Sequence, residues 1–122
     1  MKRLKHFLTF LLILLALSLS ACSKEKPGTP LNLPPAEEPS ARLFNDFGID
    51  FFEKGNYFDA SLNFNQAIVA DHTSGEVHYN MALALYMRGE EERAVKELQL
   101  AKQYADGNPE ILDSPFLKRY VK

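Results

Sequence analysis

The chain has 122 residues and repeats part of its own pattern at an offset of 34 residues. When the sequence is aligned with itself at this offset, small residues coincide: Gly55 with Gly89, Ala60 with Ala94, and Ala67 with Ala101. Large apolar residues coincide as well, Phe51 with Leu85 and Phe64 with Leu98. A period of this length is typical of repeat proteins, in which each repeat is one supersecondary unit that stacks on its neighbour. The sequence therefore predicts two stacked units between about residues 41 and 108.

Each unit has the pattern of two antiparallel helices. Val77, Met81 and Leu85 recur at helical spacing, and small residues in each predicted helix would let neighbouring helices approach closely. Glycine is favoured in the left-handed turn that ends a helix, which suits Gly55 and Gly89. Asn108 followed by proline is typical of a helix start. We expect helices at about 42–54, 57–70, 75–88 and 91–104, and a broken C-terminal helix at 109–121.

This pattern resembles tetratricopeptide (TPR) repeats. With Ala41 and Gly75 as first positions, the small and bulky residues of the family consensus fall in register in both repeats. His78 and Phe44 stand where the family usually has Trp, and Glu91 replaces an aromatic residue. The resemblance implies an all-α fold: a TPR-type α-solenoid of two helix-turn-helix repeats, 41–74 and 75–108, plus a C-terminal capping helix at 109–121.

The first helix of each TPR repeat lines a concave groove. The resemblance places six apolar or aromatic residues there, which together would form an apolar partner-binding patch: Ile49, Phe52, Tyr79, Leu83, Tyr86 and Met87. A helix or an extended segment of another protein would fit such a groove. Two alternatives stay open: the proline-rich or C-terminal segment covers the groove, or these positions are ordinary surface. A carboxylate clamp is not expected, because no basic pair faces Asn80.

The N-terminal segment has the layout of a secretory signal peptide, with Lys2, Arg3 and Lys5 before an uncharged apolar run. That run is shorter than a membrane-spanning helix requires. It ends in Leu19-Ser20-Ala21-Cys22, which resembles the lipobox of bacterial lipoproteins and holds the only cysteine of the chain. The resemblance implies that residues 1–21 are removed and that Cys22 is lipidated with diacylglycerol and palmitate-type acyl chains. An uncleaved anchor helix and a chance cysteine are the alternatives.

Residues 22–40 differ from the rest, because five of the seven prolines lie here and apolar side chains are few. This composition predicts an extended, unpacked linker with a reach of roughly 50 Å, followed by one domain at 41–122. Three of the 14 Lys and Arg residues lie in the removed segment, so the mature chain has a net charge of −5. Nucleic acid and anionic lipid surfaces are therefore unexpected partners.

No catalytic motif accompanies these features. His72 and His78 have no metal-ligand spacing, and the mature chain has no Gly-rich phosphate loop or nucleophile elbow. We therefore expect no enzyme activity, cofactor or metal site. The two resemblances imply a lipid-anchored scaffold or adaptor that binds another protein of the bacterial cell envelope, in pilus or secretion assembly or in outer-membrane assembly.

In the lipoproteins that the lipobox resembles, a residue other than Asp after the cysteine implies sorting to the outer membrane. Ser23 has this place, so the resemblance implies the periplasmic face of the outer membrane. A regulator of a cell-wall enzyme, a structural spacer without a dedicated partner, and a homodimer that completes the solenoid stay as alternatives.

Overall fold

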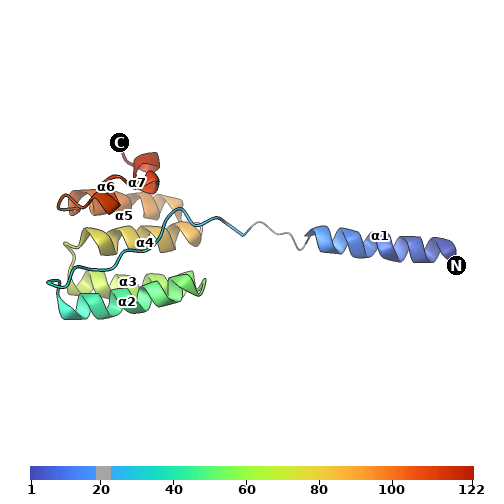
Figure 1. The fold of residues 1–122 in the computed structure, drawn as a ribbon, viewed down its shortest axis with the longest axis horizontal. Coiled ribbons are helices and arrows are strands. Elements are labelled where there is room, and N and C mark those ends of the chain that lie inside the picture. The colour runs from blue at the N-terminus through green and yellow to red at the C-terminus, as the bar shows by residue number, and fades with distance from the viewer. Residues whose placement is uncertain (19–22) are drawn as a thin grey trace.

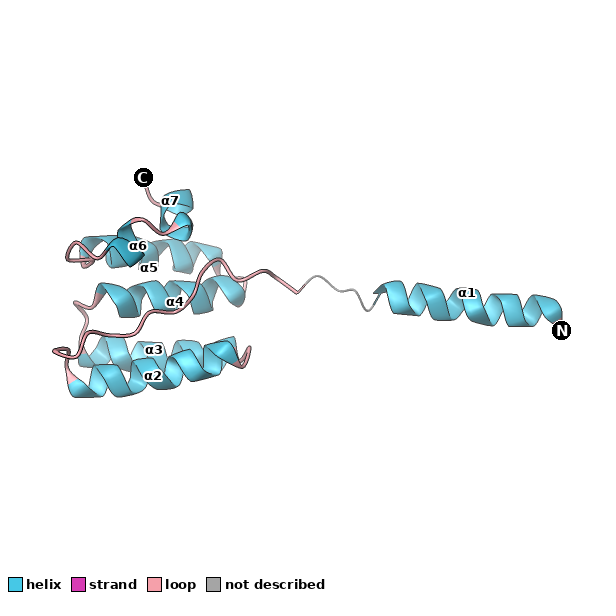
Figure 2. Ribbon diagram, viewed as in Figure 1, coloured by secondary structure: helices cyan, strands magenta, loops and turns pink. Residues whose placement is uncertain are grey.

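The computed structural model describes residues 1–18 and 23–122, and all regular secondary structure in these two ranges is helical (Figures 1 and 2). An N-terminal helix is followed by six that form the domain: α1 Lys2–Ser18, α2 Pro39–Glu53, α3 Tyr57–Ala70, α4 Gly75–Met87, α5 Glu91–Gln103, α6 Pro109–Leu112 and α7 Pro115–Tyr120. The prediction of an all-α fold is confirmed. Cys22, the predicted lipidation site, lies outside the described residues.

The α1 helix is the predicted signal segment. Its large apolar side chains from Leu4 to Leu14 are more than half exposed. Within the described ranges, no helix is both long enough and apolar enough to cross a membrane.

The four longer helices of the domain form two antiparallel pairs, α2 with α3 and α4 with α5, and α3 also packs against α4 (Figure 1). The turns inside the two pairs are the same at an offset of 34 residues. Gly55 and Gly89 both adopt positive φ, 77° and 81°, in the region that favours glycine. The N–H of Gly55 donates to the Phe52 carbonyl, and the N–H of Gly89 donates to the Tyr86 carbonyl, both at 3.0 Å. In the next residue of each turn, the Asn56 N–H donates to the Phe51 carbonyl and the Glu90 N–H donates to the Leu85 carbonyl, both at 2.9 Å. The sequence repeat is thus also a repeat of backbone geometry.

The interior depends on small residues where helices approach. A side chain at Gly48 of α2 would collide with the ring of Phe64, and one at Gly75 would come within 2.6 Å of the Tyr104 carbonyl oxygen. The alanines at the contacts between helices are buried: Ala41, Ala60, Ala67, Ala82, Ala94 and Ala101. Large apolar residues such as Leu98 fill the space between them, which gives one continuous core.

The predicted broken C-terminal helix is two short helices, each started by a capping side chain. Asn108 accepts from the Glu110 N–H at 2.9 Å, and Ser114 accepts from the Leu117 N–H at 3.3 Å. A proline follows each of these caps. Ile111, Phe116 and Leu117 are buried, so α6 and α7 cover the end of the array that α4 and α5 would otherwise expose.

The region before α2 differs from the prediction in two ways. The helix begins at Pro39 rather than near residue 42, because the Glu38 carboxylate accepts from the Ala41 N–H at 2.7 Å and caps it. The linker was expected to be unpacked, but part of it, residues 24–33, lies against α2 and α4, and Leu33 belongs to the core. Figure 2 shows this segment as a loop that runs along α4 before α2 begins.

Candidate peptide-binding groove

The groove lies between α2 and α4, and residues 24–33 occupy it. The segment runs antiparallel to α4: Lys24 contacts Tyr86 near the end of that helix, and Leu31 contacts Asn80 nearer its start. After a bend at Pro27 and Gly28, half-buried Leu31 and buried Leu33 lie on either side of exposed Asn32. This alternation is the period of two that an extended chain gives. The chain thus supplies a ligand to its own groove.

Two buried asparagines hold the backbone of this ligand. The side-chain Oδ1 of Asn80 accepts from the Leu31 N–H at 2.7 Å, and its Nδ2 donates to the Leu31 carbonyl at 2.8 Å. Asn45 of α2 donates to the same carbonyl at 3.0 Å and accepts from Asn80 at 2.8 Å. Both asparagines are 0 % exposed. The Asn80 amide therefore pairs with one residue of extended chain as a neighbouring strand would.

The basic end of the segment is held by aromatic rings. The Lys24 Nζ donates to the Tyr86 carbonyl at 2.5 Å and lies 3.7 Å from the centre of the Tyr86 ring. The Lys26 Nζ lies 5.3 Å from the centre of the Phe52 ring. Both are cation–π geometries, which add attraction at a partly exposed site. Gly28 passes so close to Tyr79 that an added Cβ would lie 2.6 Å from its hydroxyl.

The structure brings the six predicted groove residues together, but it does not leave them open. Phe52, Tyr79 and Leu83 are 1 %, 3 % and 0 % exposed, and Ile49, Tyr86 and Met87 are half-buried. The alternative in which the chain covers its own groove therefore describes this structure. The role of these residues in binding a partner stays a prediction.

The C-terminal cap contributes to this cover. The Tyr79 hydroxyl lies 2.9 Å from the Ser114 Oγ, and Phe116 makes edge contacts with the rings of Tyr79 and Tyr86. Burial raises the pKa of Tyr79 although its bond to Ser114 acts in the opposite direction. Tyr120 lies beside Tyr86 at a ring-centre distance of 6.2 Å. One wall of the groove is therefore fixed by α7.

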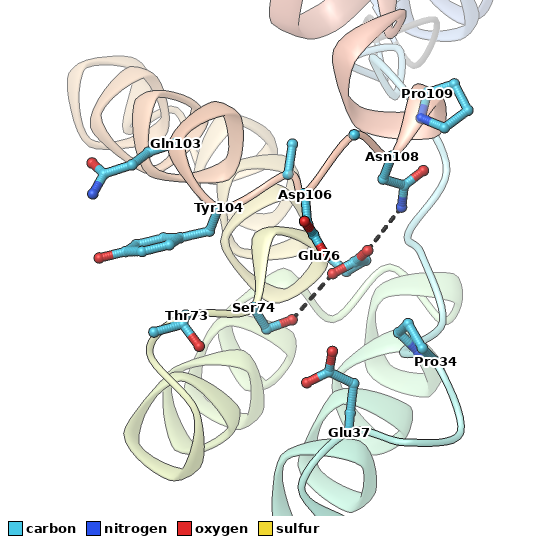
Figure 3. A pocket seen from close by; sticks show the side chains of 12 residues that line it. Pro34, Glu37, Thr73, Ser74, Glu76, Gln103, Tyr104, Asp106, Asn108 and Pro109 are labelled. Atoms are coloured by element: carbon cyan, nitrogen blue, oxygen red, sulfur yellow. Dashed lines mark hydrogen bonds between the residues drawn. The ribbon is translucent and has the colours of Figure 1, made fainter.

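A polar pocket of about 700 Å³ adjoins the other end of the segment, near Glu37 and the start of α4 (Figure 3). Ser74 and Asn108 donate hydrogen bonds to the Glu76 carboxylate, at 3.3 and 2.8 Å. Figure 3 draws both as dashed lines. Burial, and then a hydrogen bond with Asp71, raise the pKa of Glu37. Across the described part of the chain, no group of three His, Cys, Asp or Glu residues is arranged to hold a metal ion. The Glu76 carboxylate here joins the start of α4 to the loop before α6.

His78 of α4 is also buried, and it contacts α5 and the loop before α4. Its Nδ1 lies 2.7 Å from the Glu97 carboxylate and its Nε2 lies 2.8 Å from the His72 carbonyl. Burial alone would lower the pKa of His78, but these two acceptors and the nearby Asp71 charge raise it. Two acceptors favour a ring with a proton on each nitrogen. When it is protonated, His78 therefore joins α4 to α5 through an ion pair with Glu97.

Exposed apolar side chains of the domain gather on α2 and α3. They are between 48 % and 74 % exposed: Leu43, Phe47, Phe58, Leu62 and Val69. The Arg88 guanidinium lies 5.0 Å from the centre of the Phe58 ring.

Comparisons of the chain with protein-family models, with curated proteins and with solved structures find no match. Function is therefore inferred from the sequence and from the groove. The sequence analysis considered Asn80 only for a carboxylate clamp, and it missed the joint role of Asn80 and Asn45. Their spacing of nearly one repeat is the signal that places both side chains on one wall.

Proposed function

We propose that this chain is a lipid-anchored, TPR-type adaptor of the bacterial cell envelope that binds an extended segment of another protein. The observation that carries the proposal is the hold of Asn45 and Asn80 on one residue of extended chain. Backbone pairing of this kind gives affinity, while the aromatic and apolar walls of the groove give selectivity. The groove is therefore chemically a peptide site, although residues 24–33 occupy it here.

The repeated turns support the TPR part of the proposal. A chance similarity of sequence would not require the hydrogen bonds of Gly55 and Gly89 to coincide at the same offset of 34 residues. The tight approaches at Gly48 and Gly75 agree with a close stack of helix pairs. The cap formed by α6 and α7 agrees with the need of a short array to cover its last repeat.

The anchor is supported by the sequence alone. The apolar helix α1 precedes Leu19-Ser20-Ala21-Cys22, and two or three acyl chains on Cys22 would hold the protein to a bilayer nearly permanently. Mass spectrometry of the mature N-terminus tests this part: we expect a chain that starts at a lipidated Cys22. An unmodified cysteine, or a start elsewhere, would contradict it.

The adaptor function is tested by crosslinking from the groove in cells. A photoreactive amino acid at half-buried Met87 should crosslink one envelope protein reproducibly, and one at exposed Glu92 of α5 should not. Tyr86→Ala should reduce the Met87 crosslink at least tenfold, whereas Phe58→Ala, a matched loss of an exposed aromatic ring, should leave it unchanged. The same proteins crosslinked from both positions would refute the proposal.

The alternative of a structural spacer has one observation in its favour, which is that the groove is already filled by Leu31 and Leu33. A spacer needs no open site. It predicts that position 87 gives no reproducible crosslink under any growth condition.

A further inference from the structure

The segment in the groove is held at few points. Among residues 24–33 only Leu33 is buried. Four residues are half-buried, Pro27, Gly28, Pro30 and Leu31, and the other five are exposed. The hydrogen bonds from its backbone to the domain all involve one residue, Leu31. Ordering ten residues is entropically unfavourable, so part of the free energy gained from these contacts is offset. These are the properties of a ligand that can leave without unfolding the domain.

The contacts also define what else would fit. The groove requires one residue in extended conformation whose N–H and C=O both face Asn80, and an apolar side chain two positions later in the place of Leu33. Proline is accepted on both sides of this motif, because Pro30 and Pro34 flank it. Proline favours the extended backbone that the groove binds. The chemical class is therefore an extended, proline-flanked segment with alternating apolar residues.

Release of the segment has a consequence for the distance to the membrane. Lys24 is the first residue of the described range 23–122 that contacts the groove, and only Ser23 separates it from Cys22 in the sequence. While the segment is seated, an anchor at Cys22 keeps the domain close to the bilayer. After release, residues 23–33 become a linker before the turn at Pro34–Glu37 and the start of α2, with a reach of roughly 34 Å at about 3.1 Å per residue.

We propose that residues 24–33 are an intramolecular ligand of the groove, which an extended, proline-flanked segment of a partner displaces, and that displacement lengthens the tether of the domain. The partner and the membrane parts of this inference rest on the proposed function. The competition between residues 24–33 and an added peptide is independent of the proposed function.

The test uses the full chain in detergent and a labelled synthetic peptide with the sequence of residues 24–33. Leu33→Asp places a charge at the one buried position of the segment, and Asn32→Asp places the same charge at the neighbouring exposed position. A tethered ligand competes at an effective concentration on the order of millimolar. We therefore expect Leu33→Asp to bind the peptide at least tenfold more tightly than Asn32→Asp or the unmodified chain.

Equal affinity in the three proteins, or no binding to Leu33→Asp, would overturn the proposal. Circular dichroism must give the same helix content for Leu33→Asp as for Asn32→Asp. Leu31→Pro provides a second variant, because it removes the N–H that donates to Asn80 without adding a charge. It should give the same gain in affinity.

The two proposals fail separately. If the peptide binds as expected but no partner is crosslinked from position 87, the adaptor function fails and the resident ligand stands. If a partner is crosslinked but the peptide binds Leu33→Asp no more tightly than the unmodified chain, the proposal of a resident ligand fails and the adaptor function stands.

Discussion

The two asparagines of the groove allow a matched test of how the segment is held. Asn45→Ala and Asn80→Ala remove the same atoms from helices at positions that are both 0 % exposed. The change in helix propensity and the loss of side-chain volume are therefore nearly equal. The two substitutions differ in the polar groups that they leave without partners.

Asn80→Ala leaves the Leu31 N–H and the Asn45 Oδ1 without their partners, whereas the Leu31 carbonyl keeps its bond from Asn45. Asn45→Ala leaves one N–H of Asn80 without an acceptor. Each buried polar group that loses its partner costs about 1–3 kcal/mol. We expect Asn80→Ala to lower the free energy of unfolding by about 1–2 kcal/mol more than Asn45→Ala.

Urea denaturation followed by circular dichroism measures both free energies, and the slope with urea checks that the folded states bury similar surface. The cost of Asn80→Ala has an upper limit, because the segment can leave the groove and let water reach the remaining polar groups. Equal losses for the two variants, or a larger loss for Asn45→Ala, would refute the hydrogen-bond reasoning.

Three further predictions concern other parts of the chain. The raised pKa of His78 means that its protonated form, paired with Glu97, stabilises the fold; this contribution is complete below the unfolded pKa of about 6.5 and is lost as pH rises through the higher folded value. The free energy of unfolding, measured by urea denaturation, should therefore fall more between pH 5.5 and pH 8.5 for the unmodified chain than for His78→Gln. An equal fall in the two proteins would count against the ion pair. Gly48→Ala should lower the free energy of unfolding by about 1–3 kcal/mol, because the new methyl group meets the Phe64 ring; an unchanged urea midpoint would contradict this packing. Cys22→Ser should move the protein from the membrane fraction to the soluble fraction of cells that process the signal segment, and an unchanged membrane fraction would argue against a lipid anchor.

Local signals in the sequence were sufficient for most of the helices. The turn at Gly55 recurs at Gly89, and the caps Asn108 and Ser114 each precede a proline, so the helix pairs and the broken C-terminal helix could be predicted. The start of α2 was placed three residues late. Its cap is the Glu38 carboxylate, and glutamate is not among the residues usually found at that position.

The groove itself depends on contacts that the sequence does not reveal. Two leucines around Asn32 are too short an alternation to mark an extended segment, and the Asn80 amide that holds Leu31 is 49 residues away. A proline-rich composition therefore predicted an unpacked linker, although part of it is packed. For the same reason the repeat pattern could place Phe52 and Tyr79 on the groove wall but could not tell what covers them.

The exchange rate of the Leu31 amide hydrogen tests the central claim most directly. In the full chain the Leu31 N–H donates to buried Asn80, whereas the Asn32 N–H donates no hydrogen bond within the described part of the chain. An amide in such a bond exchanges only when the segment opens. The account predicts slow exchange at Leu31, fast exchange at Asn32, and a faster rate at Leu31 when an excess of the peptide with the sequence of residues 24–33 is added. Equal, fast exchange at both amides would mean that the groove does not hold the segment, and would contradict the account.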